Sequence, residues 1–238
     1  MKILITNDDG VQAAQLPGLI RWAKKLGEVT VVVPKVEQSA KSHSISIKEP
    51  MQIRQILLNG EFPVWTVDST PADCVRFAAV YLKEQYDLVI SGVNRGYNIG
   101  QDMLYSGTLA AASEAANKGW PSLALSTSIK YYDHATDHLD LIYDYLLSRN
   151  LWQKHPIYNV NIPVDPTGIR ITRQGEESFH EEFIPMGNDM FLPGGKPIRS
   201  RDDDLTKDTA AVAHGYISVT PITTNRTDLA VFAALSQE

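Results

Sequence analysis

The chain has 238 residues, 43% of them hydrophobic, which is enough for a sizeable core in one α/β domain with an appendage. Its 28 acidic and 22 basic residues give a net charge of -6, which excludes a general attraction to a nucleic-acid backbone or an anionic membrane. Cys74 is the only cysteine, so no disulfide can form within the chain. We therefore expect a cytoplasmic protein without a signal peptide or a membrane span.

Apolar runs alternate with amphipathic segments from the start of the chain to residue 162. This alternation predicts strands at 3–6, 29–33, 63–67, 87–90, 122–126 and 158–162. It predicts helices at 16–26, 71–85, 106–118 and 137–147. Thr70 is the predicted N-cap of the second helix, and Ser106 or Thr108 that of the third. β-branched strands that alternate with helices indicate a mostly parallel sheet covered by helices on both faces, where ligands bind beyond the carboxyl ends of strands.

The pattern changes after Pro163. Residues 175–208 mix glycine, proline and charge, which predicts a protruding hairpin or an irregular arm. The acidic run at 201–204 is expected to be a solvated loop. A strand at 215–221 and a short helical tail at 227–235 complete the chain. We therefore predict an α/β core at 1–174, followed at 175–238 by the arm, a returning strand and the tail, all in one structural unit.

Two adjacent carboxylates follow the first predicted strand, in the sequence Asn7-Asp8-Asp9-Gly10. Neighbouring acids repel each other, so proteins usually place them where water or a cation neutralises them. A divalent metal site is one interpretation of Asp8 and Asp9. A simple turn is the other, because Asn-Asp-Asp-Gly is also favourable turn chemistry.

Two more polar loops follow later strands. Residues 37–44 carry several hydroxyls and His43, which is a proton donor to the leaving oxygen, a substrate contact or a solvated side chain. Residues 91–100 repeat glycine every four positions, with Asn94 and Asn98 in the gaps. Glycine allows close backbone approach and asparagine offers a neutral oxygen to a hard cation, which indicates a phosphate-and-metal loop unless the segment is an ordinary glycine-rich loop. Neither a Walker loop nor the dinucleotide fingerprint is present.

A fourth loop holds Ser106, Gly107 and Thr108 at the predicted start of a helix of small residues. Backbone amides at a helix start, with two hydroxyls beside them, favour an anion, although plain N-capping is the alternative. Together the four loops supply hard oxygen ligands for Mg²⁺ or Mn²⁺ and donors for a phosphoryl group, without a histidine or cysteine cluster suited to zinc. The implied chemistry is metal-assisted phosphoryl transfer.

Seven segments together resemble the SurE family of survival-protein nucleotidases, over residues 2 to about 224. They are Asn7-Asp8-Asp9-Gly10, Gln38-Ser39-Ala40, Ser69-Thr70-Pro71-Ala72-Asp73-Cys74-Val75, residues 91–100, Tyr105-Ser106-Gly107-Thr108, Asn159-Val160-Asn161-Ile162-Pro163 and residues 208–221. The resemblance implies a Rossmann-like core whose C-terminal arm exchanges between the subunits of a homodimer or homotetramer. It also implies a metal-dependent phosphatase of nucleoside 5'- and 3'-monophosphates, with a side activity on polyphosphate to be tested.

The resemblance also assigns site residues. The metal ligands of the family match Asp8, Asp9, Ser39 and Asn94. The segments that line the same cleft contain Asn98, Ser106, Gly107 and Thr108, which we assign to the phosphate of the substrate. One Mg²⁺ or Mn²⁺ per subunit is implied, and Asp8 or Asp9 is the expected catalytic residue that orients the attacking water.

Two positions depart from the family pattern. The acidic motif is normally followed closely by Ala-Pro-Gly, whereas residues 11–18 here form a longer loop, which we expect to reshape the rim of the cleft. Ala40 stands where the family often has glycine after the serine, a change that keeps the Ser39 hydroxyl.

Three other kinds of protein are alternatives to this family. A receiver-like module needs an acceptor aspartate where Ser91-Gly92 lies, and a dehydrogenase needs a glycine fingerprint where the acids lie. A regulatory module that binds metal and phosphate without turnover is the remaining alternative to an enzyme.

Overall fold

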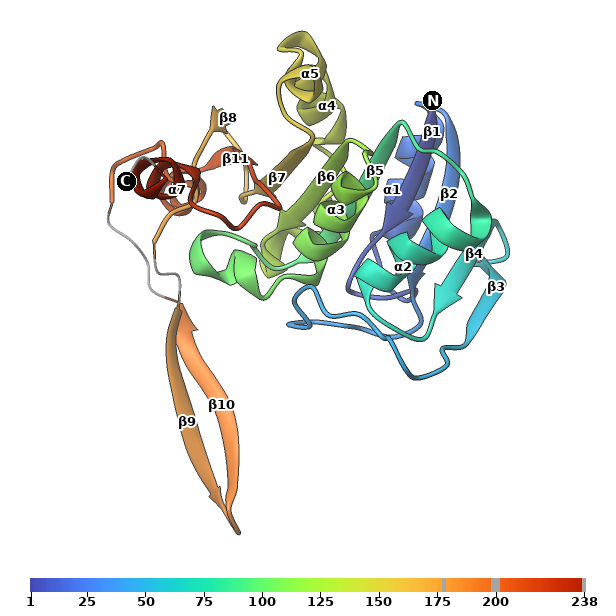
Figure 1. Cartoon of the computed structure of the whole chain (residues 1–238), viewed down its shortest axis with the longest axis horizontal. Coiled ribbons are helices and arrows are strands. Elements are labelled where there is room, and N and C mark those ends of the chain that lie inside the picture. Colours follow the sequence, from blue (N-terminus) through green and yellow to red (C-terminus); the bar gives the residue numbers. More distant parts are fainter. Residues whose placement is uncertain (177–178, 198–201, 237–238) are drawn as a thin grey trace.

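The computed structural model describes residues 1–176, 179–197 and 202–236, so parts of the predicted arm and the end of the tail lie outside the described residues. Among the described residues, nine strands form one sheet in the order β3-β4-β2-β1-β5-β6-β7-β11-β8 (Figure 1). The bounds of these strands are β1 Lys2–Thr6, β2 Glu28–Pro34, β3 Ile53–Leu58, β4 Phe62–Val67, β5 Leu88–Arg95, β6 Ser122–Thr127, β7 Ile157–Ile162, β8 Gly168–Ile171 and β11 Tyr216–Pro221.

Helices connect most of these strands. Their bounds are α1 Leu16–Lys24, α2 Pro71–Phe77, α3 Gly107–Asn117, α4 Leu139–Ser148, α5 Leu151–Lys154, α6 Asp208–Ala213 and α7 Leu229–Leu235, with a π-helix η1 at Ala78–Leu82 and 3₁₀-helices η2 at Gly100–Leu104 and η3 at Ile129–His134. In the described parts of the chain, every helix is too short or too polar to cross a lipid bilayer.

The sheet is mostly parallel and its strand order reverses once. From β1 the chain moves outward to β2 and β4, and it then returns to add β5, β6 and β7 on the other side of β1, all in parallel pairs. The edge strand β3 is antiparallel to β4, and β11 is antiparallel to β7. The reversal between β1 and β5 opens a crevice at their carboxyl ends, which is where open α/β sheets bind ligands.

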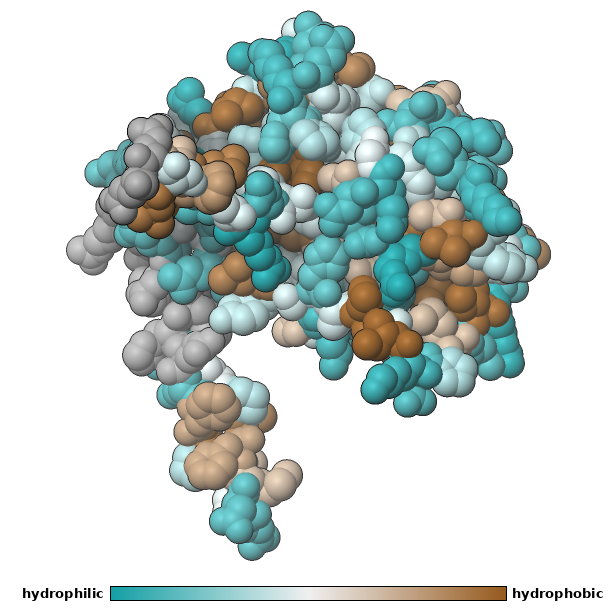
Figure 2. All heavy atoms as spheres, in the orientation of Figure 1, coloured by the Kyte–Doolittle hydropathy of each residue, from teal (hydrophilic) through white to brown (hydrophobic). Residues whose placement is uncertain are grey.

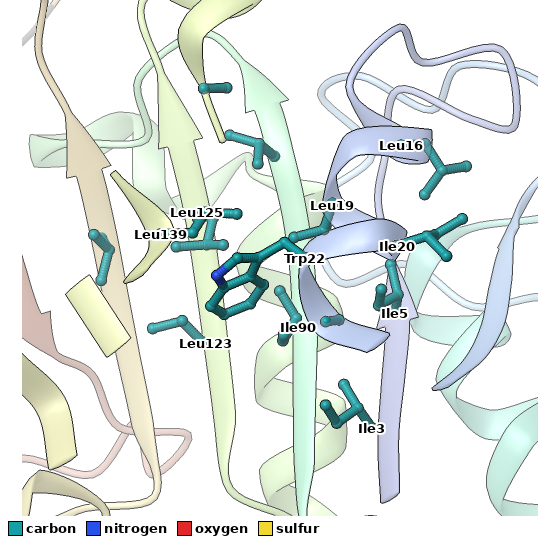
Figure 3. Packing of buried hydrophobic residues seen from close by; sticks show 14 of the residues in the cluster. Ile3, Ile5, Leu16, Leu19, Ile20, Trp22, Ile90, Leu123, Leu125 and Leu139 are labelled. Carbon is teal, nitrogen blue, oxygen red and sulfur yellow. The ribbon is translucent and has the colours of Figure 1, made fainter. Parts of the chain in front are cut away.

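Helices cover both faces of this sheet because its central strands are apolar on both sides. In β1, Ile3 and Ile5 join one buried cluster with Trp22 of α1, while Leu4 joins a second cluster on the opposite face with Ala111 of α3. Figure 3 shows the first cluster, in which Trp22 lies over the sheet. Burial of each large apolar side chain contributes about 1.5–3 kcal/mol, so the ends of β1 and β5 are carried on a rigid base.

The predicted fold class is confirmed, and every predicted strand and helix is present with shifted ends. The strand predicted at 87–90 continues to Arg95, because pairing with β6 resumes at Asn94 after a shift in register. Gly92 permits this shift: its φ is +135°, and a Cβ there would lie 2.4 Å from the Leu125 carbonyl oxygen. The helix predicted at 71–85 stops earlier, since Lys83 adopts a left-handed conformation with φ of +57°.

A two-stranded hairpin projects from the body (Figure 1). It pairs β9 (Phe179–Gly187) with β10 (Met190–Pro197) in antiparallel register, which confirms the predicted hairpin. Apolar side chains line it in the space-filling view (Figure 2). Phe183 is 69% exposed and Phe191 is 60% exposed. The division of the chain at residue 174 stays a prediction.

Candidate active site

Four polar loops meet at the crevice between β1 and β5. The backbone N–H of Gln38 donates to the carbonyl oxygen of Asp8 at 2.7 Å, which joins the first and second loops. The N–H of Arg95 donates to Asp9 at 3.1 Å and joins the third. The N–H of Ser42 donates to the carbonyl oxygen of Tyr105, directly before Ser106, at 3.0 Å and so connects the second loop to the fourth. The four loops, which follow separate strands in the sequence, therefore lie together in the folded chain.

The first loop holds its acids in a fixed turn. Asn7 is 1% exposed, and its side chain donates to the Gly10 carbonyl at 3.0 Å and accepts from the Gly10 N–H at 3.1 Å. Gly10 has a φ of +82°, and a Cβ there would lie 2.8 Å from the Val36 carbonyl carbon, so only glycine fits. Residues 7–10 therefore form the predicted turn, and this turn is compatible with a metal site at Asp8 and Asp9.

Asp8 is buried against the start of α3. Its side chain accepts a hydrogen bond of 2.6 Å from the Thr108 hydroxyl, and Asp8 and Thr108 are 4% and 0% exposed. A Cβ on Gly107 would lie 3.0 Å from the Asp8 Cβ, so this close approach needs glycine. Burial raises the pKa of Asp8, while the hydrogen bond from Thr108 opposes that rise.

Asp9 is half-buried beside Asp8. Burial and then the charge of Asp8 raise the pKa of Asp9 from 3.8 to about 6, and the charge of Glu37 adds to the rise. The Arg95 N–H and the Tyr132 hydroxyl, at 3.1 and 3.5 Å, donate to its Oδ2 atom. The ionised pair is thus held at an electrostatic cost that a bound cation would relieve.

Ser39 and Asn94 carry the two neutral oxygens predicted for a metal. Ser39 is exposed and donates its hydroxyl to Glu37 at 2.6 Å, a bond that uses the proton and not the lone pairs of the Ser39 oxygen. Asn94 donates from its side-chain nitrogen to the Gly96 carbonyl at 2.8 Å, which leaves its side-chain oxygen as an acceptor. Both side chains can therefore present an oxygen to a cation.

The start of α3 offers hydrogen-bond donors to an anion. Ser106 is the N-cap, and its oxygen accepts from the Leu109 N–H at 3.1 Å, which leaves the hydroxyl proton to donate elsewhere. The N–H groups of Gly107 and Thr108 belong to the first turn of α3, where no helical carbonyl precedes them. The predicted N-cap and the predicted anion site thus occupy the same helix start.

The hydrogen bonds of Asn98 go to β6 and β7. Its side-chain nitrogen donates to Ser126 at 2.8 Å, and its N–H donates to Asn161 at 2.8 Å. Asn159 and Asn161 in turn donate to the Asn98 carbonyl, at 2.7 and 3.1 Å. Asn98 is therefore anchored to β6 and β7, while the other predicted substrate residues lie at α3.

A cleft of about 810 Å³ opens beside these loops, and its lining includes Asp9, Ser39 and Arg95. The predicted 11–18 loop ends earlier, at residue 15, because α1 begins at Leu16, and it contributes Gln12, Ala13 and Ala14 to the wall of the cleft. The predicted effect of this loop on the rim of the cleft is consistent with that placement. His43 lies outside the cleft, in contact with Glu114 at 3.2 Å, and lines a second cavity of about 440 Å³ together with Ser106.

The donor set fits a hard divalent cation. Over the described ranges 1–176, 179–197 and 202–236, no group of three or more histidine, cysteine, aspartate and glutamate side chains is arranged to hold a metal. Two carboxylates, a hydroxyl and an amide oxygen remain, and all are the hard oxygen ligands that suit Mg²⁺ or Mn²⁺. The raised pKa of Asp9 agrees with this, since a cation would stabilise the ionised form.

Comparison with known proteins identifies the family. A family model described as "Survival protein SurE" matches residues 3–181. The chain belongs to the SurE family. Two SurE relatives are named "5'-nucleotidase SurE": that of Thermosipho melanesiensis is 40% identical over 234 residues, with 93% of this chain and 91% of the relative covered, and that of Chlorobaculum tepidum is 39% identical, with 95% and 90% covered.

A solved structure supports the same membership. The crystal structure of the SurE protein from Aquifex aeolicus matches with a TM-score of 0.81 and 30% identity, covering 100% of this chain and 99% of that chain. The resemblance and the fold class predicted from the sequence are therefore confirmed. The roles of individual residues in this SurE chain stay predictions.

Sequence reasoning did not assign two neighbours of the acids. Glu37 stands in the second loop, but its position beside both aspartates follows from the contact between loops. Tyr132 lies on η3, 123 positions from Asp9 along the chain, and no local pattern marks it. In contrast, Asn159 and Asn161 did carry a signal, because two buried asparagines in an apolar strand need partners.

Proposed function

We propose that this protein is a phosphomonoesterase that hydrolyses nucleoside 5'- and 3'-monophosphates to a nucleoside and phosphate, using one divalent metal ion per subunit. The contact between Asp8 and the first turn of α3 carries the proposal, because it joins acids suited to a cation with donors suited to a phosphate. SurE relatives that are named 5'-nucleotidase, one of them 40% identical, support the same reaction.

We assign Mg²⁺ or Mn²⁺ to Asp8, Asp9, Ser39 and Asn94. Such an ion supplies polarisation of a phosphoryl oxygen and a lowered pKa for a water. Asp8 and Asp9 are the proposed catalytic residues, and their carboxylates would orient the attacking water by accepting its hydrogen bonds. Asp8 is the better fixed of the two, since the Thr108 hydroxyl restrains it at 2.6 Å.

We assign the substrate phosphate to the start of α3. The Ser106 hydroxyl and the N–H groups of Gly107 and Thr108 would donate to phosphate oxygens and stabilise the charge that develops in the transition state. Thr108 would act through its backbone, since its hydroxyl proton is used by Asp8. We retain Asn98 among the substrate residues as one that holds the loop, because its side-chain nitrogen already donates to Ser126.

We also propose a homodimer or homotetramer in the cytoplasm, with the hairpin arm packed on a second copy. Isolated two-stranded hairpins are marginal in water, and the apolar side chains on this one need a cover. Phe183, Met186 and Phe191 are 69%, 65% and 60% exposed. The single cysteine supports a location in the reducing cytoplasm.

Phosphate release tests this proposal. We expect release from nucleoside 5'- and 3'-monophosphates with Mg²⁺ or Mn²⁺, loss of release after chelation, and loss in an Asp9→Asn variant. Asp133→Asn is a matched control, because Asp133 is an exposed acid in the same cleft. Tripolyphosphate in the same panel tests the side activity. Binding of Mn²⁺ and phosphate without release of phosphate from any ester would overturn the proposed enzymatic activity and favour a regulatory module.

A further inference from the structure

Asp208 is a fully buried carboxylate between the site loop and the base of the arm. It is 0% exposed and lies at the start of α6. Its Oδ1 atom accepts from the N–H groups of Gly175 and Thr209, each at 2.7 Å. The Gly100 N–H donates to its Oδ1 and Oδ2 atoms at 3.3 and 3.1 Å. A buried acid with this many backbone donors holds three segments of chain at one point.

The backbone N–H and the carbonyl oxygen of Gly100 are both hydrogen-bonded. Its N–H donates to Asp208, and its carbonyl oxygen accepts from the Gln174 side chain at 2.8 Å. Its φ is +55°, and a Cβ there would lie 2.4 Å from the Glu176 carbonyl oxygen. The residues from 174 to 176 that lead into the arm therefore clamp Gly100 closely, and we call Asp208, Gln174 and Gly100 the loop clamp.

The loop clamp lies at one end of a segment whose other end carries the proposed metal ligand Asn94. Asn94 is fixed by the pairing of β5 with β6. Asn98, between the two, is fixed by Asn159 and Asn161. The segment leads directly from Gly100 through η2 to the Ser106 N-cap. Since Asn94 and Asn98 are anchored by other strands, a change at Gly100 would pass through η2 to the start of α3.

We propose that Asp208 and Gln174 are positioning residues for the reaction, which fix Gly100 and thereby set the place of residues 100–106, and with them the start of α3, against the substrate. This inference rests on the proposed phosphomonoesterase function. Because Asp208 also binds Gly175, the same contact makes substrate affinity depend on where the base of the arm lies. Asp8 and Asp9 follow β1, and Asn94 is held by the pairing of β5 with β6, so we expect Mn²⁺ binding to stay unchanged when the clamp is altered.

Asp208→Asn tests the role with little change of shape. The asparagine oxygen can still accept from Gly175 and Thr209, but its nitrogen would face the Gly100 N–H, donor against donor. We expect KM for a nucleoside monophosphate to rise at least tenfold, kcat to change less than threefold, and Mn²⁺ binding measured by electron paramagnetic resonance to stay unchanged. Gln174→Met, which removes the second contact, should raise KM in the same direction and keeps the test usable if Asp208→Asn does not fold.

Tyr158→Phe is the control for stability. It removes another buried hydrogen bond, of 2.7 Å to the Leu151 carbonyl, at the end of β7 away from the crevice. A loss of stability in Asp208→Asn and Gln174→Met with KM unchanged, as expected for Tyr158→Phe, would overturn the positioning role while leaving the enzyme intact. A wild-type protein that releases phosphate from no nucleotide would overturn the proposed function and this inference with it.

Discussion

Replacement of Asp9 by asparagine should stabilise the metal-free protein. The pKa of Asp9 is about 6 in the folded chain, against an ordinary value of 3.8, and the difference corresponds to about 3 kcal/mol. Because Asp9 is only half-buried, solvent screening reduces this upper bound, and we expect a gain of about 1–3 kcal/mol at pH 8. The asparagine oxygen can still accept from the Arg95 N–H, so no buried donor is left unpaired.

The sign of the pH dependence follows from the raised pKa. The folded state binds the Asp9 proton more tightly than the unfolded state, so ionised Asp9 destabilises the fold. This penalty is complete above pH 6 and fades as the pH falls towards 3.8. The advantage of the variant over the wild type should therefore shrink from pH 8 to pH 5.

Urea unfolding followed by tryptophan fluorescence, in the presence of a chelator, measures this difference. Trp22 lies in the core and reports the transition. Asp133→Asn serves as the control, since an exposed acid should contribute little. Equal or lower stability of Asp9→Asn at pH 8 would refute our reasoning on burial and charge at this site.

Two further substitutions test neighbouring features. Ala40→Gly should raise the free energy of unfolding by up to about 1 kcal/mol. Ala40 has a φ of +57°, and the strain that glycine removes there exceeds the conformational entropy that glycine adds to the unfolded chain. A lower melting temperature in the variant would contradict this. Thr108→Val should lower stability at pH 8 by about 1–3 kcal/mol, since the buried Asp8 loses its 2.6 Å hydrogen bond. Urea titration of the variant and the wild type at pH 8 measures the loss, and equal stability would contradict it.

The sequence predicted the central strands well because they are apolar on both faces. β1 and the first half of β5 are runs of apolar residues in the sequence, and the polar residues that follow each run lie at the crevice. The edge strand β3 was missed since most of its residues are exposed and only Leu58 is buried, so no hydrophobic period marks it. The end of β5 was missed because Asn94 and Arg95 are polar residues that still pair with β6.

The candidate site was predictable as a set of loops but not as a set of contacts. Strand-end chemistry pointed to Asp8, while the hydrogen bond from Thr108 joins residues 100 positions apart and follows only from the packing of α3. The loop clamp is similar: Asp208 is 108 positions from Gly100. Such contacts depend on the tertiary fold, which local periodicity does not encode.

The placement of β11 has a consequence for synthesis. In the described sheet β8 meets its neighbours only through β11, and β11 begins about 45 residues after β8 ends. β11 begins about 54 residues after β7 ends, so at translation rates of about 5–20 residues per second the edge of β7 stays open for roughly 3–11 s. A nascent chain halted within the arm would hold both strands of the crevice and an uncovered strand edge, which is the form most prone to pair with another unfinished chain.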